Sequence, residues 1–134
     1  MQRITDGGFN TIRTWAAFSR EELEVIAQYD IKIIMGIWID PEGDFSDPFF
    51  ITSASDIVNN VLSYSKDFDN IIGYLIMNEP LPHTIFSAGF DETIDFWATI
   101  KDLIQNQHPG RPVRNPLFPG HFLNLKFFRL VSSR

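Results

Sequence analysis

Short apolar runs alternate with amphipathic stretches along the chain. Residues 31–39 and 71–77 are almost continuously apolar and rich in Ile, which predicts strands covered on both faces, as in a parallel sheet. Residues 10–15 form a shorter β-branched and aromatic run that also predicts a strand. Two further strands are expected, a short one at residues 111–115 and another at residues 127–132.

Amphipathic segments with helical spacing separate the first four strands. Ser19 and Glu22 have the spacing of a capping box, in which the two residues satisfy each other's free backbone N–H groups. Pro and Gly residues predict loops over residues 40–52 and through His83 and Gly89. The helices are expected at residues 19–29, 53–68 and 91–107.

Strands that alternate with helices predict parallel βαβ units in an α/β fold. A doubly wound nucleotide-binding sheet would carry a glycine-rich turn after its first strand, and none follows Trp15. A (β/α)8 TIM barrel instead gathers polar and aromatic side chains just beyond the carboxyl ends of its strands. Three successive strands end in this way, with Arg13 and Trp15, with Trp38 and Asp40, and with Asn78 and Glu79. The pattern therefore favours the barrel.

The length of the sequence limits how much of a barrel it can provide. A complete TIM barrel takes about 250 residues, or about 200 at the least, whereas this sequence has 134. The first residues also fall within what should be a helix rather than at the start of a strand. We therefore expect residues 1–134 to form one incomplete barrel domain.

Composition and charge narrow the function classes. The formal net charge of -6 disfavours nucleic acid as a partner, because phosphate binding requires clustered cations. The absence of Cys excludes disulfides, thiol catalysis and zinc–thiolate sites. No apolar run approaches the roughly 20 residues needed to cross a bilayer, so no membrane segment is expected. The His residues lack metal-ligand spacing, and we expect neither a metal nor a cofactor.

The tripeptide Asn78-Glu79-Pro80, at the end of the apolar run 71–77, is the sharpest chemical signal. Cleavage of a glycosidic bond needs a carboxylic acid that protonates the leaving oxygen, and an apolar surround keeps such a group protonated near the working pH. Glu79 is the candidate for this acid, and Asn78 could donate a hydrogen bond to a neighbouring sugar hydroxyl. The alternative is a polar turn in which Pro80 merely ends the strand.

Three segments resemble strands two, three and four of the clan A glycoside hydrolases. They are residues 10–15 (NTIRTW), 33–38 (IIMGIW) and 71–80 (IIGYLIMNEP). The likeness covers roughly residues 3–115, and more loosely residues 122–132. The clan includes the cellulase and mannanase family and the β-galactosidase and β-glucuronidase family. The resemblance implies a fragment with roughly barrel strands 2 to 6, a retaining mechanism, and a secreted or cell-envelope location.

The resemblance also implies roles for individual residues. Glu79 matches the acid/base of the clan, Asn78 matches the residue that binds the sugar 2-hydroxyl, and Arg13 matches the residue that supports the nucleophile carboxylate. The nucleophile itself is a second Glu at the end of the seventh strand, and nothing in this sequence matches it, because no Asp or Glu follows Asp102. We expect the nucleophile to lie outside this sequence and the chain alone to be inactive.

Three acidic residues on the loop after residue 39 could approach Glu79, namely Asp40, Glu42 and Asp44. A carboxylate in such a loop more often caps a turn or faces solvent than attacks a sugar. Retention would require two carboxyl groups about 5–5.5 Å apart. These acids are therefore poor replacements for the missing nucleophile.

Aromatic and histidine side chains complete the expected site. Trp15 and Trp38 either stack on sugar faces or pack within the barrel, and His83 lies in a loop that could line the cleft. The expected substrate is a β-linked oligo- or polysaccharide.

Two alternatives remain open from the sequence. One is a carbohydrate-binding half-barrel remnant without catalysis, and the other is an unrelated barrel enzyme in which Glu79 is a base or a metal ligand. If only these residues are present, unpaired strand edges predict aggregation or edge-to-edge self-association.

Overall fold

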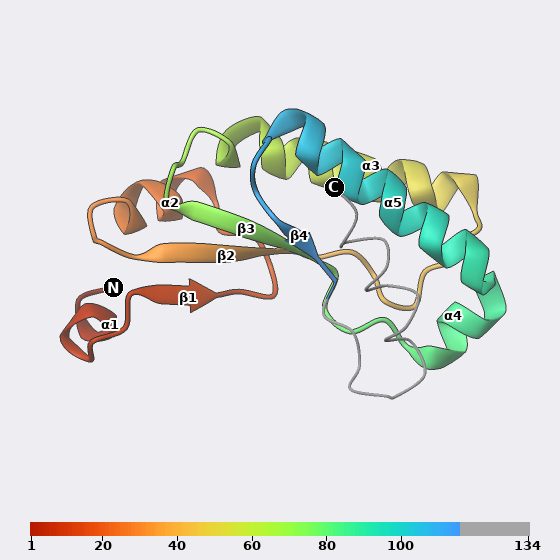
Figure 1. Ribbon diagram of the computed structural model, residues 1–134, viewed down its shortest axis with the longest axis horizontal. Helices are drawn as coiled ribbons and strands as arrows, with labels where there is room; N and C mark the ends of the chain where they lie inside the picture. Colours follow the sequence, from red (N-terminus) through yellow and green to blue (C-terminus); the bar gives the residue numbers. More distant parts are fainter. Residues whose placement is uncertain (116–134) are drawn as a thin grey trace.

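The computed structural model describes residues 1–115 as an α/β structure built on one parallel sheet (Figure 1). The strands are β1 (Thr11–Arg13), β2 (Lys32–Ile37), β3 (Ile71–Ile76) and β4 (Val113–Arg114). The helices are α1 (Gln2–Asp6), α2 (Arg20–Ile26), α3 (Pro48–Ser65), α4 (Pro82–Ala88) and α5 (Phe90–Gln107). The predicted α/β class and the parallel strand pairing are confirmed.

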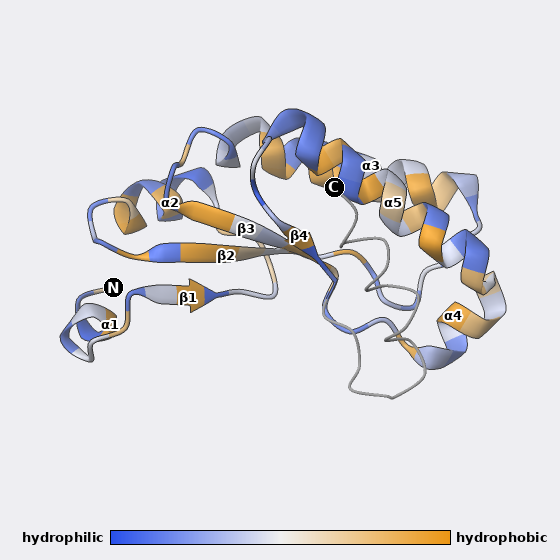
Figure 2. Ribbon diagram, in the orientation of Figure 1, coloured by the Kyte–Doolittle hydropathy of each residue, from blue (hydrophilic) through white to orange (hydrophobic). Residues whose placement is uncertain are grey.

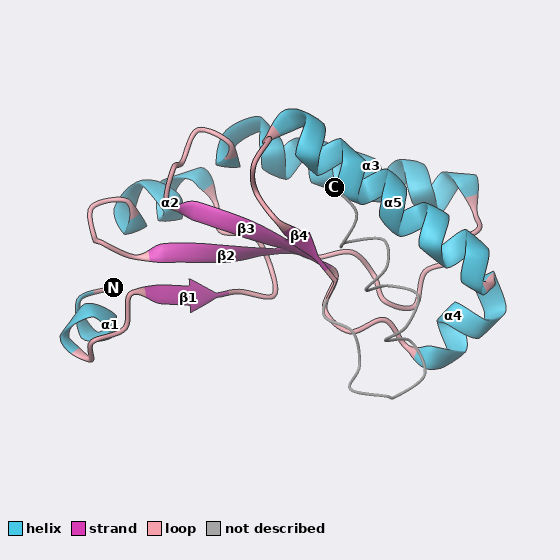
Figure 3. Cartoon of the chain, in the orientation of Figure 1, coloured by secondary structure: helices cyan, strands magenta, loops and turns pink. Residues whose placement is uncertain are grey.

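The spatial order of the strands is their order in the chain, β1-β2-β3-β4, and every neighbouring pair is parallel. Helices α2, α3 and α5 lie on one side of this sheet, and α3 packs against both α2 and α5 (Figures 1 and 3). A doubly wound sheet would reverse its strand order and carry helices on both faces. The described part of the chain does neither, and its parallel strands in sequential order are consistent with part of a (β/α) barrel.

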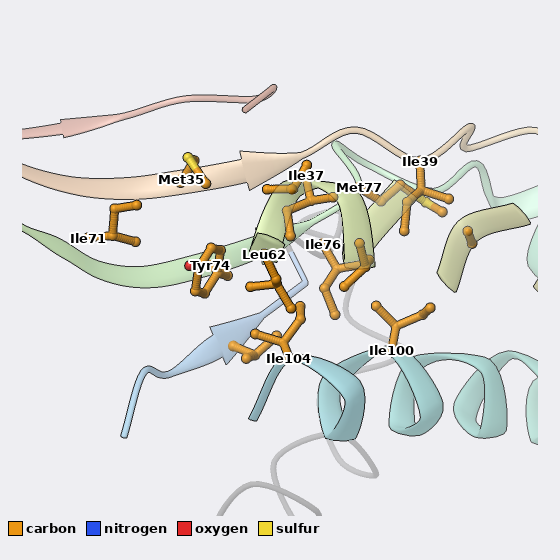
Figure 4. Packing of buried hydrophobic residues seen from close by; sticks show 14 of the residues in the cluster. Met35, Ile37, Ile39, Leu62, Ile71, Tyr74, Ile76, Met77, Ile100 and Ile104 are labelled. Carbon is orange, nitrogen blue, oxygen red and sulfur yellow. The ribbon is translucent and has the colours of Figure 1, made fainter. Parts of the chain in front are cut away.

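The core lies between the sheet and the three helices that cover it. Ile33, Met35 and Ile37 of β2 are fully buried, and the strand pairing sets them beside residues of β3 that face the same helices, Ile71, Tyr74 and Ile76. The helices contribute buried residues at helical spacing, including Val58 and Leu62 of α3 and Ile100 and Ile104 of α5. Figure 4 shows this packing, and Figure 2 shows apolar residues recurring among polar ones along α3 and α5.

The opposite face of the sheet is less covered than the sequence predicts. Arg13, Ile34 and Gly73 lie in one row across β1, β2 and β3 on this face; Arg13 is exposed and Ile34 is half-buried. Ile72 is 38% exposed. The expectation that the strands are covered on both faces is therefore wrong for residues 1–115, whose helices cover one face.

Two helices differ from the sequence prediction. Helix α3 begins at Pro48, not at residue 53, because the Asp47 side chain accepts the Phe49 N–H at 3.0 Å and Pro occupies the first turn, where no N–H is needed. Helix α4 occupies a stretch predicted to be a loop, and it also starts with a proline, Pro82. Both errors come from taking Pro as a breaker where it starts a helix.

The remaining elements agree with the prediction to within a few residues. The capping box of Ser19 and Glu22 is present at the start of α2, and α5 ends at Gln107, next to His108. The predicted fifth strand at residues 127–132 lies outside the described residues. No helix within residues 1–115 is long and apolar enough to span a membrane.

Candidate active site

A pocket of about 310 Å³ lies at the carboxyl ends of β1 and β3. Its lining consists of Arg13, Thr14, Trp15 and Asn78. The volume is at the lower end of the range for small-molecule sites, which typically measure about 300–1,000 Å³. Three of the four lining residues were predicted as site residues, and the fold brings them together because parallel strands end at the same edge of a sheet.

The chain turns sharply where β3 ends. The Met77 N–H still donates to the Ile37 carbonyl at 2.9 Å, but Met77 has a φ of +62° and Glu79 a φ of +60°. These left-handed conformations are uncommon for residues with a side chain and cost free energy that the surrounding structure must supply. They place Asn78, half-buried, in the pocket lining, whereas Glu79 is exposed beside it.

The exposure of Glu79 corrects one expectation. The sequence predicts an apolar surround for this carboxyl group, because apolar residues precede it along the chain. Those residues, Ile76 and Met77, are buried on the helix-covered side of the sheet (Figure 4). Glu79 is the second of the two left-handed residues, and its side chain is exposed instead of sharing that environment.

A side chain takes part in the end of the ladder between β1 and β2. The Thr14 N–H donates to the Ile34 carbonyl at 3.0 Å, and the Gly36 N–H donates to the Thr14 side-chain oxygen, Oγ1, at 2.9 Å. Thr14 is the pocket residue that the sequence analysis did not single out. It lies within the segment NTIRTW, but its role arises from this strand pairing, which the segment by itself does not indicate.

The two tryptophans at this edge contact each other. The ring centroids of Trp15 and Trp38 are 5.6 Å apart, and the rings are nearly perpendicular at 83°. Trp15 is 63% exposed and lines the pocket, whereas Trp38 is 44% exposed and does not. The two predicted aromatic residues therefore form one edge-to-face pair, of which only Trp15 lines the pocket.

His83 is placed differently from the prediction. It lies in the first turn of α4, exposed and outside the lining of the pocket. Figure 1 shows α4 between the end of β3 and the start of α5. The part of the chain that the structure describes does not bring His83 into contact with the pocket, and its assignment to the site remains a prediction.

The acidic loop after β2 is held by local hydrogen bonds. The Asp40 carboxylate accepts the Glu42 N–H at 2.9 Å. The Asp44 carboxylate accepts the Ser46 hydroxyl at 2.6 Å and the Ser46 N–H at 2.9 Å, and these bonds lower the pKa of Asp44. Both Asp residues therefore cap turns. Within residues 1–115 no group of three or more Asp, Glu, His or Cys side chains is placed to hold a metal ion.

A buried chain of hydrogen bonds lies on the helix side of β3. The Tyr74 hydroxyl is 3.0 Å from the Ser65 hydroxyl oxygen and 2.9 Å from Nδ1 of His108. Burial raises the pKa of Tyr74, against the opposing effect of the Ser65 hydrogen bond. Burial also lowers the pKa of His108, and Arg111 adds to that effect. The network ties β3 to α3 and to the end of α5, and thereby fixes the strand that carries Asn78 and Glu79.

No protein-family model matches this sequence, and no curated protein matches it either. Solved structures do resemble it. One is a β-D-glucuronidase from Dictyoglomus thermophilum, with a TM-score of 0.69 and 19% sequence identity over 85% of this chain and 21% of that one. Another is a β-glucuronidase from Ruminococcus gnavus in complex with a C6-substituted uronic isofagomine, with a TM-score of 0.66 and 15% identity over 84% of this chain and 19% of that one.

The likeness establishes a shared fold. This chain spans about a fifth of the length of either β-glucuronidase. Over that fifth the strand and helix arrangement of the glucuronidases matches that of the described chain, in agreement with the arc of parallel strands seen here.

Proposed function

We propose that this chain is part of a glycoside hydrolase that hydrolyses O-glycosidic bonds in β-linked carbohydrates with retention of configuration. In this proposal the sheet is one arc of a (β/α)8 barrel, Glu79 is the acid/base, and the nucleophile is a carboxylate outside this sequence. The observation that carries the proposal is the pocket at the carboxyl ends of β1 and β3, where Arg13, Trp15 and Asn78 meet beside Glu79. The fold shared with two β-glucuronidases supports the same class of enzyme.

The chemistry divides between the residues of the pocket and the exposed rim. The Asn78 amide donates a hydrogen bond to a sugar hydroxyl next to the reacting carbon, and such a bond strengthens in the transition state. The Arg13 guanidinium has no ion-pair partner within residues 1–115. Its charge is therefore free to hold a carboxylate, in this proposal that of the nucleophile. Trp15 and Trp38 form the aromatic wall, and His83 is assigned to the outer part of the cleft.

Glu79 serves both steps of the double displacement. It first gives its proton to the leaving oxygen while the nucleophile attacks the sugar carbon, and it then takes a proton from the water that hydrolyses the glycosyl-enzyme. A side chain at the exposed rim suits this role, because the leaving group and the incoming water must both reach it.

The test uses the protein made from the complete reading frame that contains this chain. Hydrolysis of an unactivated β-glycoside, in which the leaving oxygen needs a proton, is compared between the unaltered protein, Glu79→Gln and Glu42→Gln. We expect Glu79→Gln to lower kcat by about 10²–10⁴-fold, the usual contribution of general acid–base catalysis. Glu42, exposed on the neighbouring loop, is the matched control and should retain activity. Unchanged hydrolysis by Glu79→Gln would contradict the proposal.

A further inference from the structure

Just after β1, a side-chain hydrogen bond takes the place of a main-chain bond to β2. In a parallel ladder that continued beyond the Thr14 N–H bond to Ile34, the next bond would join the Gly36 N–H to the Thr14 carbonyl. The Thr14 hydroxyl oxygen accepts that N–H instead, at 2.9 Å. The main chain is thereby released from the ladder while the side chain keeps it attached to β2. This is the point at which the chain reaches Trp15.

Gly36 allows the main chain of Thr14 and Trp15 to lie close to β2. A Cβ atom at this position would lie 2.7 Å from the Thr14 carbonyl oxygen and closer still to the carbonyl carbon of Trp15. Both neighbours are main-chain atoms, which cannot move aside as the end of a flexible side chain can. The chain at Thr14 and Trp15 therefore lies directly against Gly36, and only a residue without a side chain allows this approach.

The two indoles have different environments. Trp15 lines the pocket and is the more exposed of the pair, whereas Trp38 follows β2, lies outside the lining and meets Trp15 at 83°. In an edge-to-face pair the positive edge of one ring lies against the negative face of the other, which fixes their relative orientation. Trp38 thus limits how far Trp15 can rotate.

We infer that Thr14 and Gly36 are positioning residues that hold Trp15 against Trp38, so that Trp15 is the platform on which one sugar ring packs. Trp38 supports the platform and does not touch the sugar. The inference rests on the proposed function in that the ligand is a carbohydrate. A pyranose ring presents C–H groups on its face, and their slight positive charge suits the negative face of an indole. The pocket of about 310 Å³ suits one ring with Arg13 and Asn78 at its polar side.

Two measurements on the full 134-residue chain test the inference. The first is circular dichroism, in which a pair of indoles 5.6 Å apart gives coupled bands; Trp38→Phe removes the pair and provides the reference spectrum. The second is the change in tryptophan fluorescence on titration with methyl β-D-glucopyranoside. Trp97, the third tryptophan, is buried in the core and contributes a constant background.

The variants separate positioning from general stability. Thr14→Val removes the hydroxyl at constant shape, Thr14→Ser keeps it, and Thr11→Val is the same change at an exposed position of β1. We expect Thr14→Val to lose the coupled bands and to bind the glycoside about threefold more weakly, as for one lost hydrogen bond. Thr14→Ser and Thr11→Val should resemble the unaltered chain, and Gly36→Ala should resemble Thr14→Val.

Direct contact is tested at the tryptophans. We expect Trp15→Ala to weaken binding about tenfold, whereas Trp38→Phe, which keeps an aromatic support, weakens it about threefold or less. Glycoside binding that is indifferent to Trp15→Ala would overturn this inference and leave the proposed function standing. Coupled bands that persist in Thr14→Val would also overturn it. Failure of the unaltered chain to bind the glycoside would also overturn the inference, whereas the proposed function is tested separately by hydrolysis with the protein from the complete reading frame.

Discussion

Met77 and Glu79, which flank Asn78, both adopt left-handed backbone conformations, with φ of +62° and +60°. The pair directs Asn78 into the pocket and leaves Glu79 at its rim. Neither residue is a glycine, so the conformation is maintained at a cost in free energy. Strain of this kind is concentrated at functional sites, and it is found here at the tripeptide that the sequence marks as chemically significant.

The strain can be measured by replacing Glu79 with glycine. We expect Glu79→Gly to raise the free energy of unfolding by up to about 1 kcal/mol, because glycine adopts a positive φ without steric cost. Glu79→Gln keeps the Cβ atom and should leave the stability unchanged, and Glu42→Gly, outside the strained turn, should lower it. Urea denaturation of the three variants provides the comparison. Equal destabilisation by both glycine substitutions would contradict the account.

The buried hydroxyl of Tyr74 predicts a second stability effect. Tyr74→Phe removes the partner of both Ser65 and His108 Nδ1, and we expect it to lower the free energy of unfolding by about 1–3 kcal/mol, the cost of leaving buried polar groups unpaired. Tyr64→Phe is the control, since the half-buried Tyr64 hydroxyl makes one hydrogen bond, to the Phe18 carbonyl. Its expected cost is smaller, about 0.5–1.5 kcal/mol. A Tyr74→Phe chain as stable as Tyr64→Phe would refute the importance of the network.

His108 predicts the direction of a pH effect. It is 8% exposed, and burial, with the charge of Arg111, lowers its pKa below the ordinary value of 6.5 despite the opposing charge of Asp69. The unfolded chain therefore takes up this proton at a higher pH than the folded chain. The resulting stabilisation is complete above pH 6.5 and is lost as the pH falls from there through the folded pKa.

We expect His108→Asn, which keeps an acceptor for Tyr74 but does not titrate, to flatten the pH dependence of stability below that point. His83→Asn alters an exposed histidine and should leave the dependence as it is. The measurement is the denaturation midpoint of the unaltered chain and of both variants across this pH range. The prediction fails if His108→Asn retains the full pH dependence of the unaltered chain.

The outer edge of β1 predicts self-association of the isolated chain. The Asn10 carbonyl and the Thr14 N–H form hydrogen bonds with residues 32 and 34 next to it in the sheet. Successive residues of a strand point their main-chain groups to opposite sides, so those of Thr11 and Arg13 point away from β2. Such an edge is a template for another strand. We expect the apparent mass in size-exclusion chromatography to rise with concentration, and Thr11→Pro to abolish the rise while Thr11→Val does not. A chain that is monomeric at every concentration would contradict this prediction.

The parts of the fold with long, regular patterns could be predicted from the sequence. The apolar runs of β2 and β3 and the helical stripe of α5 extend over enough residues for the period to identify the element. Helix α3 was predicted to start five residues late, and α4 was missed, because the prolines at 48 and 82 act as first-turn residues. Whether a proline breaks or begins a helix depends on what precedes it, such as the Asp47 cap.

The candidate site was predictable to the extent that it depends on strand ends. Arg13, Trp15 and Asn78 come together because parallel strands present their carboxyl ends at one edge. The role of Thr14 and the exposure of Glu79 could not be predicted, since they follow from a change in the ladder at Gly36 and from two positive φ angles. Neither feature leaves a periodic signal in the sequence.

The central claim is that Glu79 exchanges protons with the leaving group and with water, and azide rescue tests it most directly. In the protein from the complete reading frame, Glu79→Gln should cleave an activated 2,4-dinitrophenyl β-glycoside to the glycosyl-enzyme, because this leaving group needs no proton, and then stall. Azide, which attacks without base assistance, should restore turnover and yield the β-glycosyl azide. Turnover that azide does not change, or a product with the α configuration, would contradict the claim.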